Sequence, residues 1–219
     1  MYDRKVKGRV LHLRVSGMLW QRSLVMEDIE TGSLWSHHLG RAMEGELKGE
    51  ELRTLPAVML TWREWRELHP GTSVLAMSRT AKRFLKGVWE DPERFVYVLP
   101  GRTGQPAPAL DLALLQKQGV VDVTIDGVPV LVTHAADGTG VQAFESRVAG
   151  RDLAFEGGLD GGLVDRQTRS RWNRSSGVCE AGELKGQRLP SRFGMISFRA
   201  AWEAFHEGGK LLGNADDGK

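Results

Sequence analysis

Two tryptophans, each followed two residues later by a polar side chain that can carry positive charge, are the candidates for a binding site. Trp35 precedes His37, and Trp172 precedes Arg174. Residues i and i+2 of a strand face the same side, so each indole would lie beside an imidazole or a guanidinium. An indole beside a polar cation could line a pocket for a small anionic or planar ligand. The simpler explanation is that each tryptophan is a core anchor of its own segment.

Histidine and cysteine are the residue types of this chain that could act as metal ligands or nucleophiles. His37 and His38 are adjacent, and neighbouring strand residues face opposite sides, so the pair could not easily share one metal ion. His12 and His134 are distant in sequence and complete no recognisable ligand spacing. Cys179 is the single cysteine, which excludes an internal disulfide and a multi-cysteine cluster. We predict no metal site, no cofactor and no catalytic residue.

Two pairs of carboxylates recur at matching places in the chain. Asp28 matches Asp165, and Glu46 matches Glu183. Paired carboxylates could do acid–base work if they faced one cleft. However, Asp28 precedes a Thr-Gly turn and Glu46 lies between glycines, so turn chemistry explains both.

All these residues belong to a segment that occurs twice. Residues 30–49 read ETGSLWSHHLGRAMEGELKG, and residues 167–186 read QTRSRWNRSSGVCEAGELKG. The register continues to Gly71 and Gly208 and, across a short deletion in the second copy, reaches back to Tyr2 opposite Phe144. The period is too long for a solenoid repeat. We therefore predict two copies of a small domain, or two halves of a pseudo-symmetric one.

Composition places the chain among ordinary soluble globular proteins. Hydrophobic residues make up 41% and charged residues 26% of its 219 residues. The net charge of +2 is almost balanced, so neither a nucleic acid nor a membrane surface is indicated as a partner. No apolar run is long enough to span a bilayer, and the first residues lack the apolar stretch of a signal peptide. We expect the chain as given to be cytoplasmic, and an N-terminally truncated chain would leave the location open.

Alternating apolar residues predict a mainly β fold. Strands are expected over residues 2–6 and 9–15, joined by a tight turn at Lys7-Gly8. The clearest hairpin joins residues 120–125 to 128–133 through Asp126-Gly127.

One short helix is expected near the end of each copy. Thr61 and Glu64 form a capping-box pattern ahead of Trp65. In the second copy, Ser197 is the expected N-cap, and Trp202 belongs to the apolar stripe. A helical stripe of this kind is more typical of a core than of a cofactor site.

Several motifs together resemble one bacterial family of unknown function, DUF3179. In the first half they are Val15-Ser16-Gly17-Met18-Leu19, Thr31-Gly32-Ser33-Leu34-Trp35-Ser36, Gly45 to Gly49, and Thr61-Trp62 to Pro70; in the second half they are Ala113 to Val121, Asp126 to Val130, Asp137 to Gly140, and Ala143-Phe144. The motifs are specific in combination and cover most of the chain except residues 79–108. The resemblance implies no settled activity.

One departure from the family concerns thiol chemistry. The resemblance implies a lead-in before the first copy, with two close cysteines, whereas this chain begins inside the repeat at Tyr2. The equivalent lead-in of the second copy, residues 128–137, has no cysteine. The chain is therefore expected to be a truncated member or one that has lost that site.

These observations predict two related β-rich halves, each with one short helix. The expected boundaries are 1–77 for the first repeat, 78–119 for an unmatched connector, 120–213 for the second repeat and 214–219 for a tail. The preferred function is a non-catalytic binding or interaction module, with an unknown small ligand held near Trp35, His37, Trp172 and Arg174. The alternative is an enzyme or a thiol or metal redox protein whose site lies partly in a missing N-terminal segment. An exposed sheet edge in the first half would allow a homodimer.

Overall fold

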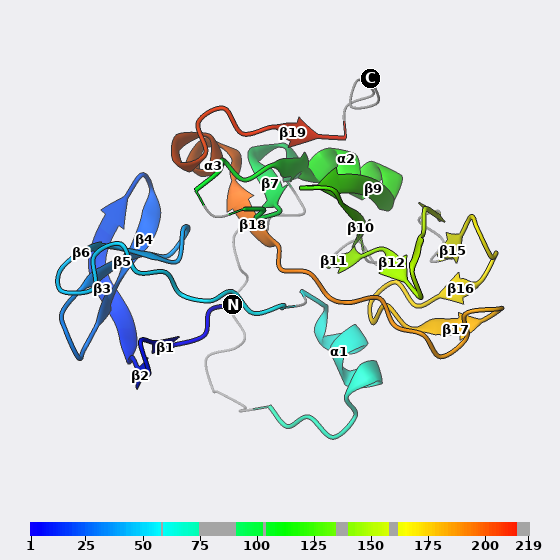
Figure 1. The fold of residues 1–219 in the computed structure, drawn as a ribbon, viewed down its shortest axis with the longest axis horizontal. Helices are drawn as coiled ribbons and strands as arrows, with labels where there is room; N and C mark the ends of the chain where they lie inside the picture. The colour runs from blue at the N-terminus through cyan, green and yellow to red at the C-terminus, as the bar shows by residue number, and fades with distance from the viewer. Residues whose placement is uncertain (58, 75–90, 103, 135–139, 158–161, 214–219) are drawn as a thin grey trace.

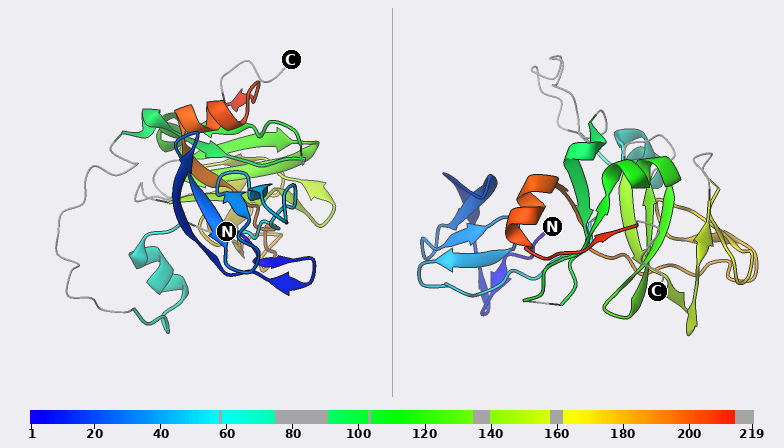
Figure 2. Two further views of the ribbon diagram at one scale, coloured as in Figure 1. Left: turned by 90° about the vertical axis from the view of Figure 1, so that its left-hand side faces the viewer. Right: turned by 90° about the horizontal axis from the view of Figure 1, so that it is seen from above.

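Two β-rich lobes lie at opposite ends of a central unit (Figure 1). The computed structural model describes residues 1–57, 59–74, 91–102, 104–134, 140–157 and 162–213. We call residues 2–55 the first lobe and residues 146–192 the second lobe. The central unit consists of strands β7–β11, β18 and β19 with helices α2 and α3. Viewed from above, the same order of lobe, central unit and lobe is seen (Figure 2).

The described elements are short, and most are strands. In chain order they are β1 (Lys5–Val6), β2 (Arg9–Val10), β3 (Leu13–Trp20), β4 (Ser23–Asp28), β5 (Leu34–Ser36), β6 (Arg41–Glu44), α1 (Trp62–Leu68), the 3₁₀ helix η2 (Pro92–Arg94), β7 (Phe95–Val98), β8 (Ala109–Asp111), α2 (Leu112–Gln118), β9 (Val120–Ile125), β10 (Val128–His134), β11 (Val141–Glu145), β12 (Arg147–Val148), β13 (Arg151–Asp152), β14 (Phe155–Glu156), β15 (Val164–Asp165), β16 (Arg171–Trp172), β17 (Cys179–Ala181), β18 (Met195–Phe198), α3 (Arg199–Phe205) and β19 (Leu211–Leu212).

The sheets repeat between the lobes. The first lobe has a sheet of order β3-β4-β5-β6, and the second lobe has one of order β14-β15-β16-β17. Between them, the central unit has the sheets β11-β10-β9 and β18-β7-β8-β19. Only the pairing of β19 with β8 is parallel among these described strands. The predicted mainly β fold, with two related halves and one short helix in each, is confirmed.

The two lobes also bury equivalent cores. Trp35 and Trp172 are 0% and 2% exposed, and each lies at the centre of its lobe's core. Around them the buried side chains match position by position: Val6, Leu11, Ala42, Leu47 and Leu52 in the first lobe, and Val148, Leu153, Cys179, Leu184 and Leu189 in the second. The duplication is therefore a duplication of packing, and the tryptophans are core anchors as predicted.

The predicted tight turns are present. Lys7 and Gly8 have φ of 47° and 80°, and Asp126 and Gly127 have φ of 51° and 80°. Two consecutive residues with positive φ define a type I′ turn, whose twist matches that of a two-residue hairpin. The β9–β10 hairpin pairs Ile125 with Val128 across its turn, as expected.

Of the two predicted helix caps, one is correct. Thr61 and Glu64 form a complete capping box at the start of α1. In the second repeat the N-cap is Phe198, which provides no side-chain oxygen, so the expected cap at Ser197 is wrong. Ser197 instead lies within β18, where it pairs with Val96, and the strand runs straight into α3.

Each repeat's helix contacts the other repeat's lobe. At the end of α3, Phe205 stacks on His38 of the first lobe with 4.7 Å between ring centroids and meets the edge of Trp20 at 4.8 Å. Beside the second lobe, Ser175 Oγ donates a hydrogen bond to Glu64 Oε1 of α1 at 3.1 Å. This exchange joins the halves and brings α3 against the first lobe (Figures 1 and 2).

Candidate functional site

The first-lobe tryptophan is tied to a buried aspartate. Trp35 Nε1 donates to Asp28 Oδ2 at 2.8 Å, and the Thr31 backbone N–H donates to Asp28 Oδ1 at 2.6 Å. The Thr31 hydroxyl also lies within 2.9 Å of the carboxylate and 2.6 Å from the Ser33 hydroxyl. Asp28 has no exposed surface. A buried carboxylate is tolerated only when hydrogen bonds satisfy it, as they do here.

The second lobe repeats this arrangement and adds a hydrogen bond from the Ser170 backbone N–H to Asp165. Trp172 Nε1 donates to Asp165 Oδ2 at 2.9 Å, and Thr168 and Ser170 occupy the places of Thr31 and Ser33. Burial would raise the pKa of Asp165, but the hydrogen bonds from Trp172, Thr168 and Ser170 outweigh it and hold that pKa below its usual range. The carboxylate is therefore ionised and fully engaged in holding the lobe together.

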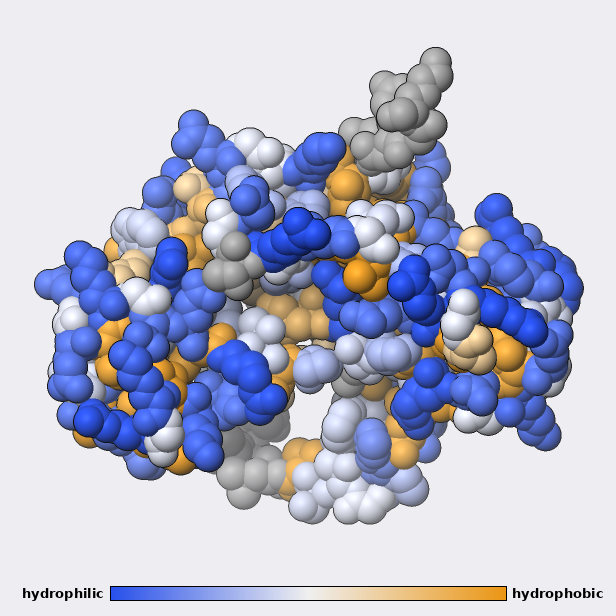
Figure 3. Space-filling model, in the orientation of Figure 1, coloured by the Kyte–Doolittle hydropathy of each residue, from blue (hydrophilic) through white to orange (hydrophobic). Residues whose placement is uncertain are grey.

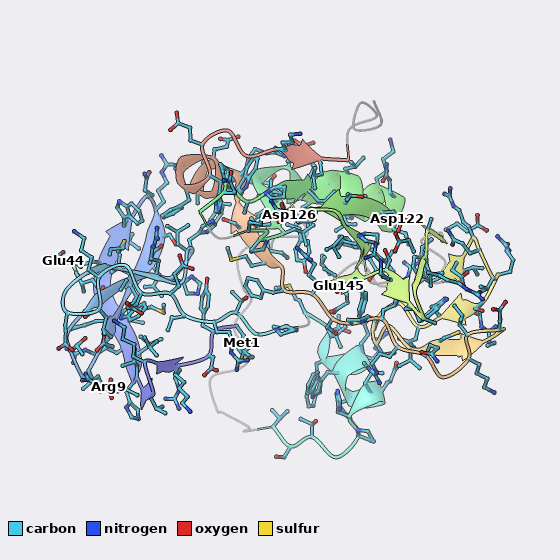
Figure 4. All side chains as sticks on the ribbon, in the orientation of Figure 1. Met1, Arg9, Glu44, Asp122, Asp126 and Glu145 are labelled. Carbon is cyan, nitrogen blue, oxygen red and sulfur yellow. The ribbon has the colours of Figure 1, made fainter. Side chains whose placement is uncertain are left out.

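These Asp–Trp networks give Asp28 and Asp165 a structural role that turn chemistry alone does not predict. Turn chemistry does explain one oxygen of Asp28, which caps the turn at Thr31. The other oxygen is the buried partner of the indole. The signal was present in the sequence as Asp, Thr, Ser and Trp at the same spacing in both copies. Glu46 and Glu183, by contrast, form exposed ion pairs with Arg9 and Arg151; Arg9 lies on the outside of the first lobe in Figure 4.

The four predicted ligand-binding residues do not lie together. Trp35 and Trp172 belong to separate cores in the two lobes. Arg174 is 5% exposed and donates to the backbone carbonyls of His134 and Gly162 at 2.9 and 3.2 Å. His37 lies just beyond the end of β5 and is exposed. The involvement of these residues in ligand binding stays a prediction.

A cleft of about 680 Å³ lies between the first lobe and the central unit. Its apolar wall includes Leu52 of the first lobe, Phe193 and Met195 of the segment that leaves the second lobe, and Phe205 of α3. The space-filling view shows the surface hollowed between the first lobe and the rest of the molecule (Figure 3). The volume of this cleft lies within the range of small-molecule sites.

Two histidines stand in the wall of the cleft. The rings of His38 and His206 are 5.2 Å apart between centroids. Burial, followed by the neighbouring His206 and His37, lowers the pKa of His38 to about 4, and burial also lowers the pKa of His206. Both imidazoles are therefore neutral at pH 7, so neither adds positive charge to the cleft.

The hydrogen bonds of this histidine pair define its chemistry. His206 Nδ1 accepts from the Ala107 backbone N–H at 3.1 Å, which leaves Nε2 of a neutral ring as the donor. His38 is 6% exposed, and its Nε2 has no hydrogen-bond partner within the described part of the chain. Tyr2 fixes the loop that carries His38, because its hydroxyl donates to the carbonyls of His37 and His38 at 2.9 and 3.2 Å.

The rim of the cleft is charged. Arg41 pairs with Glu51 at 3.4 Å, and Arg53 pairs with Asp3 at 2.6 Å. Arg102 also lines the cleft, and its guanidinium has no ion-pair partner among the residues that the structure describes. It is the uncommitted cation of this described rim.

Cys179 is 1% exposed in the second-lobe core, and burial raises the pKa of its thiol, which disfavours the reactive thiolate. Within the described ranges no three histidine, cysteine, aspartate or glutamate side chains group as metal ligands. No helix in the described part of the chain combines the length and the apolar character needed to cross a membrane.

The fold and the cleft define a two-lobed, mainly β protein built on an internal duplication. The chain belongs to the family described as a protein of unknown function, DUF3179, whose model matches residues 1–92 and again residues 86–209. The two matches agree with the two-part repeat seen in the lobes. Neither the curated proteins nor the solved structures gave a match to the chain.

Proposed function

We propose that the protein is a non-catalytic binding module whose ligand occupies the cleft between the first lobe and the central unit. The ligand would have a planar apolar body and one anionic group. The observation that carries this proposal is the combination of a 680 Å³ cleft with an apolar wall and the uncommitted Arg102 on its rim. Pockets for drug-sized ligands occupy about 300–1,000 Å³ and combine apolar walls with few polar groups.

Among the charged groups that line the cleft, Arg102 is the candidate to hold an anion, and Glu207 is a carboxylate of the same lining that would repel one. Arg41 and Arg53 are already matched by Glu51 and Asp3, so they add little net attraction. Arg102 supplies a guanidinium that can hold a carboxylate through two parallel hydrogen bonds. Its backbone N–H is fixed by Asp126 Oδ2 at 2.8 Å, which holds this part of the chain in the central unit; Asp126 is labelled in Figure 4.

The histidine pair would orient the ligand. His206 Nε2 can donate to an acceptor on the ligand, and the neutral His38 ring extends the aromatic wall formed by Phe205. The ring of His38 lies almost parallel to that of Phe205, at 15°. A planar ligand would continue this stack, since offset stacking of aromatic rings is favourable.

A pair of nearly identical probes tests the proposal. Naphthalene-2-carboxylate carries the anion, and naphthalene-2-carboxamide has the same shape without the charge. We expect the parent protein to bind the carboxylate more tightly by calorimetric titration, and Arg102→Glu to weaken it by about tenfold or more. Arg171→Glu is the matched control, because Arg171 is also exposed but lies in the second lobe.

Two outcomes would contradict the proposal. Equal affinity of the parent for the carboxylate and the carboxamide would show that the anionic group of the ligand does not contribute to binding. An equal loss of carboxylate affinity in Arg102→Glu and Arg171→Glu would show that only net charge matters. His38→Phe keeps an aromatic ring against Phe205, so this variant should bind the carboxamide as tightly as the parent does.

A further inference from the structure

A second and smaller cavity, of about 260 Å³, lies near the middle of the molecule. Ala57 and Met59, which follow the first lobe, form one side, and their repeat equivalents Gly194 and Ile196, which follow the second lobe, form another. Met1 also lines it, and in Figure 4 Met1 lies between the two lobes. The cavity is thus built where equivalent segments of the two repeats approach each other.

One polar group in this apolar cavity is unsatisfied. Tyr97 of β7 is 3% exposed, and its hydroxyl makes no hydrogen bond to the described residues. The hydroxyl lies against Gly194, where an added Cβ would come within 2.3 Å of the phenol oxygen. Because Gly194 is itself part of the wall, the hydroxyl is at the cavity. Burial raises the pKa of Tyr97, so the hydroxyl keeps its proton and is a donor.

The Tyr97 hydroxyl therefore reaches the cavity without a partner among the described residues and can donate to a group bound there. The remaining wall suits an aromatic ring. Phe193, Met59 and Met195 line the cavity, and thioether sulfurs make favourable contacts with aromatic edges. An apolar cavity of about 150 Å³ is sufficient for benzene, so a cavity of 260 Å³ accommodates a ring with a short substituent.

We propose that the central cavity binds a single-ring aromatic molecule that carries a hydrogen-bond acceptor, which receives the hydroxyl proton of Tyr97. This site is independent of the one proposed for the cleft, although Tyr2, Phe193 and Met195 line both. The proposed ligand is neutral because a hydroxyl holds its acceptor; the basic groups of the described lining are the amino terminus of Met1 and the imidazole of His37, and burial lowers the pKa of both.

Two compounds of the same shape test this proposal. Acetophenone carries a carbonyl acceptor, and isopropenylbenzene replaces that oxygen by a methylene group. By NMR titration, the parent is expected to bind acetophenone about three- to tenfold more tightly, the usual net effect of one hydrogen bond. Tyr97→Phe should reduce this ratio to about one and leave the affinity for isopropenylbenzene unchanged, which also shows that the cavity persists.

Met59→Trp provides a second test, because Met59 is 45% exposed and a larger side chain there can fill the cavity. This variant should lose both compounds and keep the affinity for naphthalene-2-carboxylate, which separates the cavity from the cleft. Failure of the parent to bind either compound at millimolar concentration would mean that Tyr97 faces only water, and the proposal would be overturned. Persistence of the ratio in Tyr97→Phe would overturn it as well.

Discussion

Removing the carboxylate of Asp28 should destabilise the first lobe strongly. Asp28→Ala leaves the indole N–H of Trp35 and the backbone N–H of Thr31 without their acceptor. The Thr31 hydroxyl still has a hydrogen-bond partner in the Ser33 hydroxyl. Each buried donor left unsatisfied costs about 1–3 kcal/mol. Thr31 is only half-buried, so its amide can recover part of that loss from water. We expect a total of about 3 kcal/mol, a large part of the stability of a small domain.

The assay is urea unfolding followed by far-ultraviolet circular dichroism. Asp165→Ala should cost at least as much, since Asp165 also accepts from the Ser170 backbone N–H at 3.1 Å. Asp152→Ala is the control: Asp152 is an exposed partner of Arg147, and its loss should leave the midpoint unchanged. In a double-mutant cycle with Trp35→Phe, the losses should be less than additive, because Phe removes the orphaned N–H. A midpoint for Asp28→Ala equal to that of Asp152→Ala would refute this reasoning.

Three further predictions concern the first lobe and its contact with α3. Because burial lowers the pKa of His38 from 6.5 to about 4, the stability that depends on its neutral ring is fully present above pH 6.5, and up to about 3 kcal/mol of it is lost as the pH falls towards 4. His38→Phe should flatten this pH dependence of the free energy of unfolding, measured from pH 7 to 4. An equal decline in the parent and in His38→Phe would contradict this prediction. Gly45→Ala should lower the melting temperature by several degrees, because Gly45 has φ of 93° and its Cβ would lie 2.7 Å from the Ser33 Cα, whereas Gly71→Ala meets no atom within 4 Å. We also propose that a second copy pairs with the edge strand β3, where Val15 and Leu19 are 66% and 73% exposed; Leu19→Lys should abolish concentration-dependent association in sedimentation, and a parent that stays monomeric at high concentration would remove this proposal.

The sequence was sufficient to predict the repeat and its cores, because that information is local and occurs twice. Trp35 and Trp172 could be recognised as equivalent anchors from the register alone. The turn at Asp126-Gly127 was predictable because few residues adopt two consecutive positive φ angles. The cap of α3 was not, because β18 continues into the helix without the polar residue that a free helix start requires.

The cleft could not be predicted because its parts are distant in sequence. His38, Arg102 and His206 come from the first lobe, the connector and the end of α3. They meet only because α3 contacts the lobe of the other repeat, and no spacing in the chain encodes that exchange. The partners of Arg174 are also distant in sequence. Sequence alone therefore allowed Arg174 to be a ligand-binding cation, whereas in the structure its guanidinium donates to two backbone carbonyls.

Amide-resolved NMR of the whole chain during titration with naphthalene-2-carboxylate tests the central claim most directly. Ligand binding in the cleft predicts that the largest shifts occur at Arg41, Arg102 and His206, which line it. Shifts centred instead on Trp172 and Arg174 would place the ligand in the second lobe, and shifts spread evenly over the surface would contradict a specific site.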